Sequence, residues 1–493
     1  MEQLEVRTVP STLTVLNILD SGAGSLRDTI KHADSGDTIM FASSLHGQTI
    51  TLTKGELEIS QSLDIEGPGA GLLAVSGNNH SRVFNVSQDQ DKNTVAVTIA
   101  GLTIEDGLAS NGVGGGILNK GGTLTLNNDL LCNNQAVGRS TIDEAAVGGA
   151  IANKFGGTLT VSGCWFSGNQ ALGSETGNAF GGAIDNNGAW FGATATITNS
   201  HFIDNLARGG DGGNAPNGDA FNGLGLGGAL MNDNRGTLSV SGCTFTGNEA
   251  LGGSNIAGSA TDRRLGNGNG GALLNVAVAT VTDSTFTGNK AQGGSNNTGG
   301  PSVQYMGNGI GGGIATNVFP GGGFPQSLTV TDCTFTNNQA VGGADNVGGV
   351  VTGLGFGGGL AAYLGATVTV VNGVFYGNHA FGSDGADGLG GGIANFAGST
   401  LILSGCTLSG NDATGGAGGG HGFGGGVYND GTSGLTISSS TISSNHATGG
   451  TFGYGEGGGL YVASDGIVYL DAFTVSRTTG NTPDDIYGSY ILI

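Results

Sequence analysis

Charged side chains are scarce in this sequence, and most of those present are acidic. Only 11% of the 493 residues are charged, and 37 Asp and Glu against 15 Lys and Arg give a formal net charge of −22. A surface of this sign repels nucleic acid and anionic lipid, so neither is an expected partner. With so little charge, the surface must consist mainly of Ser, Thr, Asn and Gly.

Long apolar runs and paired cysteines are also missing. No run of 18 apolar residues occurs, so no membrane span is expected. The first residues lack the basic-then-apolar order of a secretory signal. Five cysteines without a Cys-x-x-Cys pair argue against a disulfide framework. Four of them recur at one position of the repeat described next and are expected to be small buried fillers: Cys164, Cys243, Cys333 and Cys406.

Glycine, by contrast, is abundant, with 104 residues, and it recurs in a pattern. Ten times between Gly114 and Val462 the chain reads roughly Gly-Gly-Gly/Ala-Ile-x-Asn, a short turn, Leu-Thr-Val-x-x-Cys/Ser-x-Phe-x-x-Asn-x-Ala and a glycine-rich loop. Successive copies start 33 to 46 residues apart, at Ile117, Ile151, Ile184, Leu230, Leu273, Ile314, Leu360, Ile393, Val427 and Leu460. Repeats of this period predict one elongated solenoid rather than several globular domains.

Each repeat contains three short segments of strand character. The first is the Gly-Gly-Ala-Ile-x-Asn run, the second alternates as in Thr158–Val161, and the third carries an aromatic or aliphatic residue such as Phe166. Alternation of period two places Leu159 and Val161 on one face and the threonines on the other. A strand triplet cannot bury its own apolar face, so copies must stack, which predicts the rung of a parallel β-helix.

One position just past the aromatic residue is always asparagine. Its members are Asn134, Asn169, Asn205, Asn248, Asn289, Asn338, Asn378, Asn411 and Asn445. Asparagine tolerates left-handed backbone and bonds to its own turn. Stacked inside a coil, these amides are expected to form a ladder of hydrogen bonds from rung to rung.

With these motifs in view, the chain resembles the pectin-lyase-like superfamily, whose members fold as right-handed parallel β-helices. In detail it is similar to bacterial surface proteins with GGAI-x-N and LTVSxSTFSGNxA repeats, polymorphic outer-membrane proteins among them. The segments Asp20–Lys31, Gly36–Phe41 and Gly480–Gly488 also resemble the first and last coils of those proteins. The resemblance implies an all-β, right-handed parallel β-helix of about 13 rungs. It does not imply one activity, because the superfamily mixes lyases, hydrolases, adhesins and passengers.

The expected organisation is a tail (1–12), an N-terminal cap with irregular rungs (13–110), ten repeat rungs (111–462) and a last rung with a C-terminal cap (463–493). Ser25 to Ala33 predicts a short capping helix, with Ser25 as the N-cap, that covers the open end of the coil. Ile467–Val475 is expected to form the last strands.

The loop between the conserved asparagine and the next Gly-Gly pair varies in length. It spans 12 residues from Asn169 to Gly181 but 22 from Asn205 to Gly227, and it stays long as far as Gly357. Consecutive long loops at one corner must protrude from one side of the molecule, and insertions on one face often form a binding face. Neutral drift is the alternative, since long surface loops cost little.

Candidates for chemistry are few. A glycoside hydrolase needs two carboxylates about 5–10 Å apart, and Asp185, Asp204 and Asp233 are the candidates. Turn chemistry explains Asp204 equally well. A lyase needs a basic residue, and none occurs from Ala291 to Ser476, which leaves the N-terminal half for cleavage of an anionic polysaccharide.

Two acidic loops could offer oxygen ligands to Ca²⁺, although neither matches a known calcium-loop spacing. Their residues are Asp384 and Asp387 in one loop and Asp211 and Asp219 in the other. Surface acidity explains both loops equally well, so no cofactor other than possible Ca²⁺ is expected. The histidines lack metal-ligand spacing.

These observations favour a non-enzymatic, adhesin-like or carbohydrate-binding scaffold, extracellular or on a bacterial cell surface. Its expected partner is a polysaccharide or another cell-surface component. The alternative is a polysaccharide-degrading enzyme, hydrolase or lyase, that acts at the long-loop corner of residues 205–357. Outward Thr-x-Thr pairs such as Thr158 and Thr160 raise ice binding as a remote alternative, although threonine is simply a good exposed strand residue.

Overall fold

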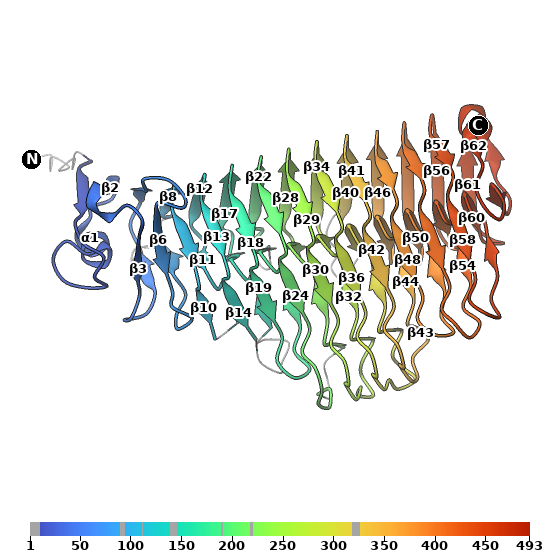
Figure 1. The fold of residues 1–493 in the computed structure, drawn as a ribbon, viewed down its shortest axis with the longest axis horizontal. Coiled ribbons are helices and arrows are strands. Elements are labelled where there is room, and N and C mark those ends of the chain that lie inside the picture. The colour runs from blue at the N-terminus through green and yellow to red at the C-terminus, as the bar shows by residue number, and fades with distance from the viewer. Residues whose placement is uncertain are drawn as a thin grey trace, which may run out of the picture.

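The chain forms one long coil of stacked β-strands with the termini at opposite ends (Figure 1). This computed structural model describes residues 10–88, 94–110, 112–138, 145–188, 191–216, 220–317 and 326–493. The paired strands of the described residues run parallel, and each strand pairs with its counterpart in the next turn of the coil. The predicted fold class, a parallel β-helix of about 13 rungs, is confirmed.

Three sheets enclose the main core, and the repeat that starts at Ile184 illustrates them. Sheet 1 contains β21 (Ile184–Asn187), sheet 2 contains β22 (Thr194–Thr198) and sheet 3 contains β23 (His201–Ile203). Among the described residues, sheet 1 has 13 strands, from β4 (Leu57–Ile59) to β63 (Ile486–Tyr487). Sheet 2 has 15, from β1 (Thr12–Val15) to β64 (Ile491–Leu492), and sheet 3 has 13, from β3 (Gln48–Thr51) to β62 (Thr478–Thr479).

The sequence predicted that the glycine-rich segment of each repeat is a simple loop. In the structure this segment instead adds two or three further strands to a repeat. Sheet 4, with ten described strands from β10 (Leu108–Ala109) to β58 (His446–Thr448), leaves the main coil. Sheet 5, with nine from β15 (Ala146–Val147) to β59 (Gly455–Glu456), returns to it. The long loops also pair as sheet 6: β25 (Phe221–Asn222), β31 (Arg264–Leu265), β37 (Tyr305–Met306) and β43 (Val351–Thr352).

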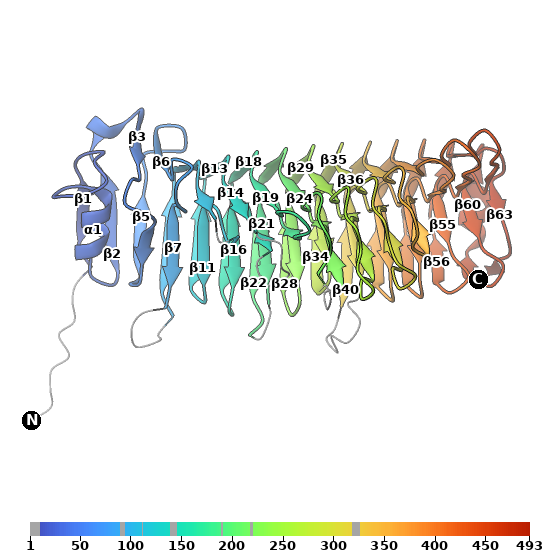
Figure 2. The same cartoon turned by 90° about the horizontal axis from the view of Figure 1, so that it is seen from below.

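Sheets 4 and 5 together make a side wing along one flank of the coil. The long loops extend it, and they protrude along the lower edge of the coil in Figure 1, around the middle of the molecule. Figure 2 shows the same coil from below. Glycine is required here because backbones of neighbouring turns approach closely: a Cβ on Gly228 would overlap the carbonyl oxygen of Gly271. The glycines that these contacts require are also typical of loops, so the sequence predicted a loop for this segment.

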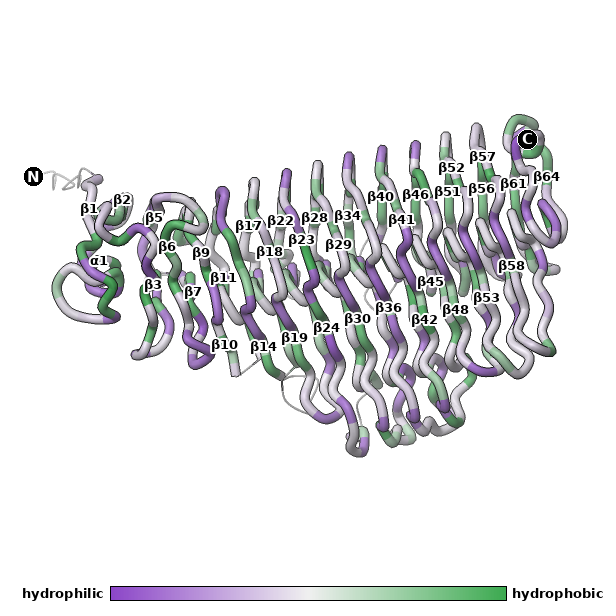
Figure 3. The backbone as a smooth tube through the Cα atoms, viewed as in Figure 1, coloured by the Kyte–Doolittle hydropathy of each residue, from purple (hydrophilic) through white to green (hydrophobic). Residues whose placement is uncertain are grey.

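The main core consists of identical side chains stacked from turn to turn. Six phenylalanines from Phe166 to Phe375 stack with ring centroids 4.5–4.8 Å apart. The predicted asparagine ladder is present, and Asn205, for example, donates to the Oδ1 atom of Asn248 over 2.9 Å. Leu159, Val161 and Cys164 are buried, and Thr158 is exposed. Figure 3 shows the resulting hydrophobic stretches at the same place in successive turns.

Both ends of the coil carry short helices. Helix α1 (Leu26–His32) is the predicted cap, and the Ser25 hydroxyl accepts a hydrogen bond from the Asp28 amide. At the other end, the expectation of strands over Ile467–Val475 is wrong in part. Strand β61 (Ile467–Leu470) ends before Asp471, which caps helix α2 (Ala472–Arg477) through the Thr474 amide. None of the described helices is long and apolar enough to cross a membrane.

Candidate functional site

The outer face of sheet 1 is covered by the wing, which creates a corner with its own interior. Apolar side chains of both sheets fill most of it, among them Met231, Leu274, Ile310, Phe356 and Leu389. Positions that the sequence placed on the outside of the coil are therefore buried between two sheets. Polar side chains in this corner are exceptions that need a reason.

Several of these polar side chains line a pocket of about 380 Å³ near the first long loop. Three of its lining residues come from the outer face of sheet 1: Lys154, Asn187 and Asp233. Aromatic and aliphatic side chains from the wing close the other side: Phe180, Phe221 and Leu226. The pocket thus combines an apolar wall with three polar groups that converge from neighbouring strands.

Strand register places these polar groups in a row. In β16 (Ile151–Lys154), Ala152 pairs with Asp185 of β21, so Lys154 and Asn187 continue the same alignment. Asn187 pairs with Asp233 of β27 (Leu230–Asp233), and its amide donates to the Asp233 carboxylate over 3.3 Å. Asp185 lies two residues earlier on the same face, so its Cα atom is about 8 Å from that of Asp233 by strand geometry.

Asp185 is fully buried and does not line the pocket. Neither carboxylate oxygen has a hydrogen-bond partner in bonding geometry among the described residues. Burial raises the pKa of Asp185 well above its ordinary value, and the Asp233 carboxylate raises it further, while Lys154 and Asn187 oppose this only in part. This environment favours the neutral carboxylic acid, because a buried carboxylate is far more costly than a buried carboxylic acid.

Asp233 lines the pocket and is only 9% exposed. Burial raises the pKa of Asp233 to about 6, against the effects of the Asn234 amide, which donates to it over 2.7 Å, and of Lys154. A carboxyl group with a pKa of about 6 can both give and take a proton near neutral pH. Asp185 and Asp233, two of the three predicted catalytic candidates, are thus neighbours in an unusual environment.

The third candidate, Asp204, is not part of this cluster. It is exposed in the turn after β23, where it adopts a positive φ of 52°, and its amide bonds to the Thr246 carbonyl. This position fits the turn role that the sequence allowed as the alternative.

Three of the four residues considered for calcium lie in the described part of the chain: Asp211 and Asp384 are exposed, and Asp387 is half-buried. Asp211 pairs with Arg208 and accepts a hydrogen bond from the Ser254 amide, and Asp387 accepts one from the His421 amide over 2.7 Å. Asp384 is exposed, and Asp219 lies outside the described residues. No group of three or more His, Cys, Asp or Glu side chains in the described ranges is arranged to hold a metal ion. The possibility of Ca²⁺ stays a prediction.

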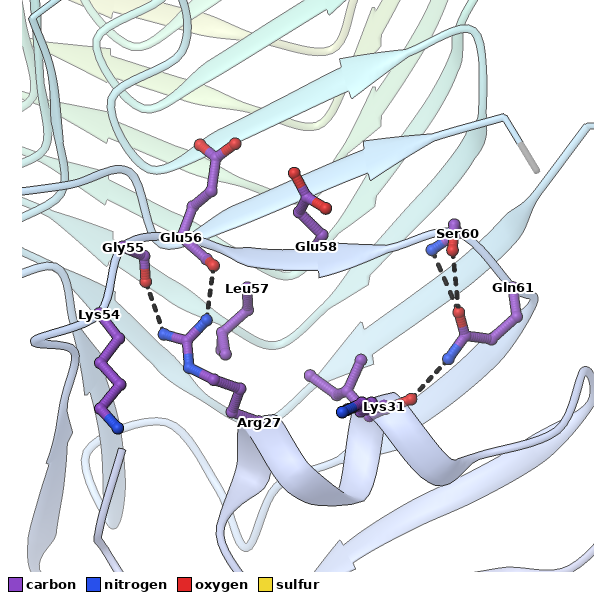
Figure 4. Close-up of a pocket in the computed structure, with 10 residues that line it drawn as sticks. Arg27, Lys31, Lys54, Gly55, Glu56, Leu57, Glu58, Ser60 and Gln61 are labelled. Atoms are coloured by element: carbon purple, nitrogen blue, oxygen red, sulfur yellow. Dashed lines mark hydrogen bonds between the residues drawn. The ribbon is translucent and has the colours of Figure 1, made fainter. Parts of the chain in front are cut away.

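A larger cavity, of about 560 Å³, lies between α1 and β4, and Figure 4 shows the residues that line it. Its polar groups form hydrogen bonds that hold the capping helix α1 in place. The Arg27 guanidinium donates to the carbonyl oxygens of Gly55 and Glu56, and Gln61 donates to the Ile30 carbonyl. These bonds attach the capping helix to the first rungs, so we assign this cavity a structural role.

Sequence reasoning missed Lys154 and the aromatic wall of the pocket. Lys154 occupies the last position of its strand, which faces the wing only because sheet 5 folds back over sheet 1. The sequence did contain evidence for this row of polar residues. The same strand ends in a polar residue in the next two repeats, at Asn187 and Asp233.

Comparisons with known proteins agree with the fold. No family model and no curated sequence matches the chain. Similar solved structures include a GH87 α-1,3-glucanase catalytic unit from Streptomyces thermodiastaticus (14% identity over 92% of this chain and 68% of that one, TM-score 0.38). A mannuronic acid-specific family 6 polysaccharide lyase from human gut microbiota is also similar (8%, 98% and 91%, TM-score 0.37). Tailspike protein 3 of bacteriophage CBA120 matches over 96% of this chain but 57% of its own length (11%, TM-score 0.35).

These comparisons contradict the expectation of a non-enzymatic, adhesin-like scaffold. The similar solved structures include proteins named as a glucanase and a lyase, the class of protein that the alternative named. The sequence favoured a scaffold because it showed no convergent cluster of carboxyl groups, and Asp185 and Asp233 become a buried pair only where the wing covers sheet 1. At these identities and TM-scores the similarity carries no argument about activity, so the case for activity depends on the described residues.

Proposed function

We propose that the protein is a polysaccharide-degrading enzyme that cleaves glycosidic bonds in the pocket of Asp233. The observation that carries the proposal is the pair of buried carboxyl groups: Asp233 lines an aromatic-walled pocket together with Lys154, and Asp185 lies behind it on the same face of sheet 1. Perturbed carboxyl groups that cluster in a cleft are typical of catalytic sites. A structural role does not explain Asp185, because the corresponding positions hold Ala152 and Met231 in the neighbouring strands.

The two carboxyl groups have different proposed roles. Asp233 contacts the substrate, because it lines the pocket, and its carboxylic acid gives a proton to the glycosidic oxygen as the bond to the sugar breaks. A water molecule adds to the anomeric carbon and releases a proton to solvent, and Asp233 takes up a proton again from solvent. Asp185 is a positioning residue: its burial favours the neutral acid, which places no second negative charge beside Asp233 when Asp233 loses its proton. Asn187 holds the Asp233 carboxyl group through its 3.3 Å hydrogen bond.

Cleavage by elimination is the second candidate. Lys154 lies in the same row and in the same pocket as Asp233, and a basic residue is what a lyase needs. The products distinguish the two reactions, since hydrolysis yields new reducing ends only, whereas elimination also yields unsaturated, ultraviolet-absorbing ends.

The decisive experiment is to incubate the protein with a panel of neutral, carboxylated and sulfated polysaccharides and to measure both products. Asp233→Asn should lower kcat by about 10²- to 10⁴-fold. Asp204→Asn, which removes an exposed turn carboxylate, should leave the rate unchanged. If Asp233 acts as the acid, kcat/KM falls as the pH rises through about 6, because the active form is protonated. Absence of any product across the panel, or full activity of Asp233→Asn, would refute the proposal.

An extracellular or cell-surface location belongs to the same proposal, because an enzyme that degrades cell-wall or matrix polysaccharides reaches its substrate outside the cell. Fractionation of the producing cells, with the protein found in the medium or at the surface, is the matching test.

A further inference from the structure

A second groove continues the row of polar residues beyond the Asp233 pocket. It has a volume of about 460 Å³ and is lined by Ser87, Gln88, Lys120, Phe155 and Phe191. Lys120, at the end of β11 (Ile117–Lys120), pairs directly with Lys154, and Phe155 follows Lys154 in the chain. The two cavities are therefore consecutive along the edge of sheet 1, and the row from Ser87 to Asp233 spans about 19 Å over four strand spacings.

The phenylalanines of this groove are not explained by the fold. Phe155 is 46% exposed and Phe191 is 73% exposed, whereas the phenylalanines of the main core are fully buried. Phe155 also adopts a positive φ of 56°, which is unfavourable for a bulky residue. Other repeats place Gly121, Asn234, Leu364 and Ala397 after the same strand, also at positive φ. The positive φ therefore belongs to the turn itself, and the exposed aromatic ring at Phe155 is what the turn does not require.

The local charge of the groove is opposite to that of the molecule. The chain carries a net charge of −22 and only 15 Lys and Arg residues, yet Lys120 and Lys154 lie side by side. The Lys120 ammonium group lies 5.9 Å from the centre of the Phe155 ring, so charge and aromatic face are presented together. An anionic group is attracted to this groove and repelled by the surrounding acidic surface.

We propose that Phe155, Phe191 and Lys120 form a sugar-binding subsite that takes an anionic sugar unit, carboxylated or sulfated, of the polysaccharide. The aromatic rings contact the C–H face of the pyranose ring, and Lys120 pairs with its acidic group. The inference rests on the proposed function for the position of the bond that is cleaved, which lies next to this subsite in the Asp233 pocket. Binding itself requires no cleavage.

The test measures binding of the full chain to polygalacturonate, to a sulfated carrageenan and to neutral dextran by affinity electrophoresis and titration calorimetry. Phe155→Gly removes the ring and relieves the positive φ, so it should leave the fold intact. We expect Phe155→Gly and Phe191→Ala each to weaken binding of the anionic polymer about fivefold to tenfold. Lys120→Gln should weaken it by a similar factor and reduce its salt dependence.

Matched controls come from the same chain. Phe452→Ala removes an exposed phenylalanine, 82% exposed, at the C-terminal end of the coil and should not change binding. Ala397→Gly tests the same turn position without an aromatic ring. Binding of polygalacturonate alone identifies a carboxylated sugar, and binding of carrageenan alone identifies a sulfated one. Equal binding of dextran, binding that none of the three substitutions weakens, or no binding to any of the three polymers would overturn the proposal.

The two proposals can fail separately. If Asp233→Asn retains Phe155-dependent binding and loses product formation, both hold. If the wild-type protein binds through Phe155 and Lys120 but cleaves nothing, the proposed enzyme is refuted and the subsite remains. If cleavage depends on Asp233 but not on Phe155, Phe191 or Lys120 for any anionic polymer, the subsite is refuted and the enzyme remains.

Discussion

Replacement of Asp233 by asparagine should make the protein more stable at neutral pH while it removes activity. The native carboxyl group has a pKa of about 6 against an ordinary value of 3.8. This difference corresponds to a cost of about 3 kcal/mol for the ionised form in the folded protein. Asparagine has the same shape, stays neutral and can still accept the hydrogen bond from the Asn234 amide. The stability lost to the buried charge is therefore regained in Asp233→Asn.

The pH dependence has a defined sign. Between pH 3.8 and about 6 the native wild-type protein binds more protons at Asp233 than the unfolded chain does. Its stability therefore falls as the pH rises through this window and is level above it. The difference between Asp233→Asn and wild type should be near zero at pH 4 and reach about 3 kcal/mol at pH 7 to 8.

Urea unfolding at constant ionic strength, followed by circular dichroism at several pH values, measures this difference. Because repeat proteins can unfold in parts, wild type and variant are compared at each pH. Asp204→Asn controls for the loss of one negative charge from the acidic surface. A wild-type protein more stable than Asp233→Asn at pH 8, or a difference that does not vary with pH, would show that the Asp233 environment described above is incorrect.

Three further predictions concern the scaffold. Asn289→Ala interrupts the ladder between Asn248 and Asn338 and should cost about 1–3 kcal/mol in thermal unfolding, because buried amides lose their partners; an unchanged melting temperature would contradict the ladder's role. Phe286→Ala opens a cavity in the phenylalanine stack and should cost about 3–5 kcal/mol by urea unfolding, whereas Phe286→Leu should cost much less. Gly228→Ala should prevent normal folding, seen as loss of soluble protein, because its Cβ overlaps the Gly271 carbonyl, whereas Gly434→Ala has open space and should be neutral or slightly stabilising.

The candidate site could be predicted only in part. Asp185 and Asp233 were selected as carboxylates of neighbouring repeats that could serve a hydrolase, and both lie in the cluster. Their relation to Lys154 was not visible, because the Lys154 side chain reaches the pocket through strand pairing and not through proximity in the chain. Asp204 carried the same residue type at a turn position, and composition alone could not separate it from the other two.

The coil itself was determined by the sequence. A repeat of 33 to 46 residues with alternating apolar positions, a stacked asparagine and a stacked aromatic residue has few ways to bury its apolar side chains, and turn-on-turn stacking satisfies all of them together. The wing was decided by tertiary structure, because strands such as Gly225–Leu226, Gly268–Asn269 and Gly309–Ile310 are only two residues long and too short to show an alternating pattern. Sheet 5 lies over sheet 1 because the backbones of neighbouring turns of the wing approach closely, a contact that is present only in the folded chain. That contact excludes water from Asp185 and Asp233, and the exclusion of water is what raises their pKa values and gives the pocket its chemistry.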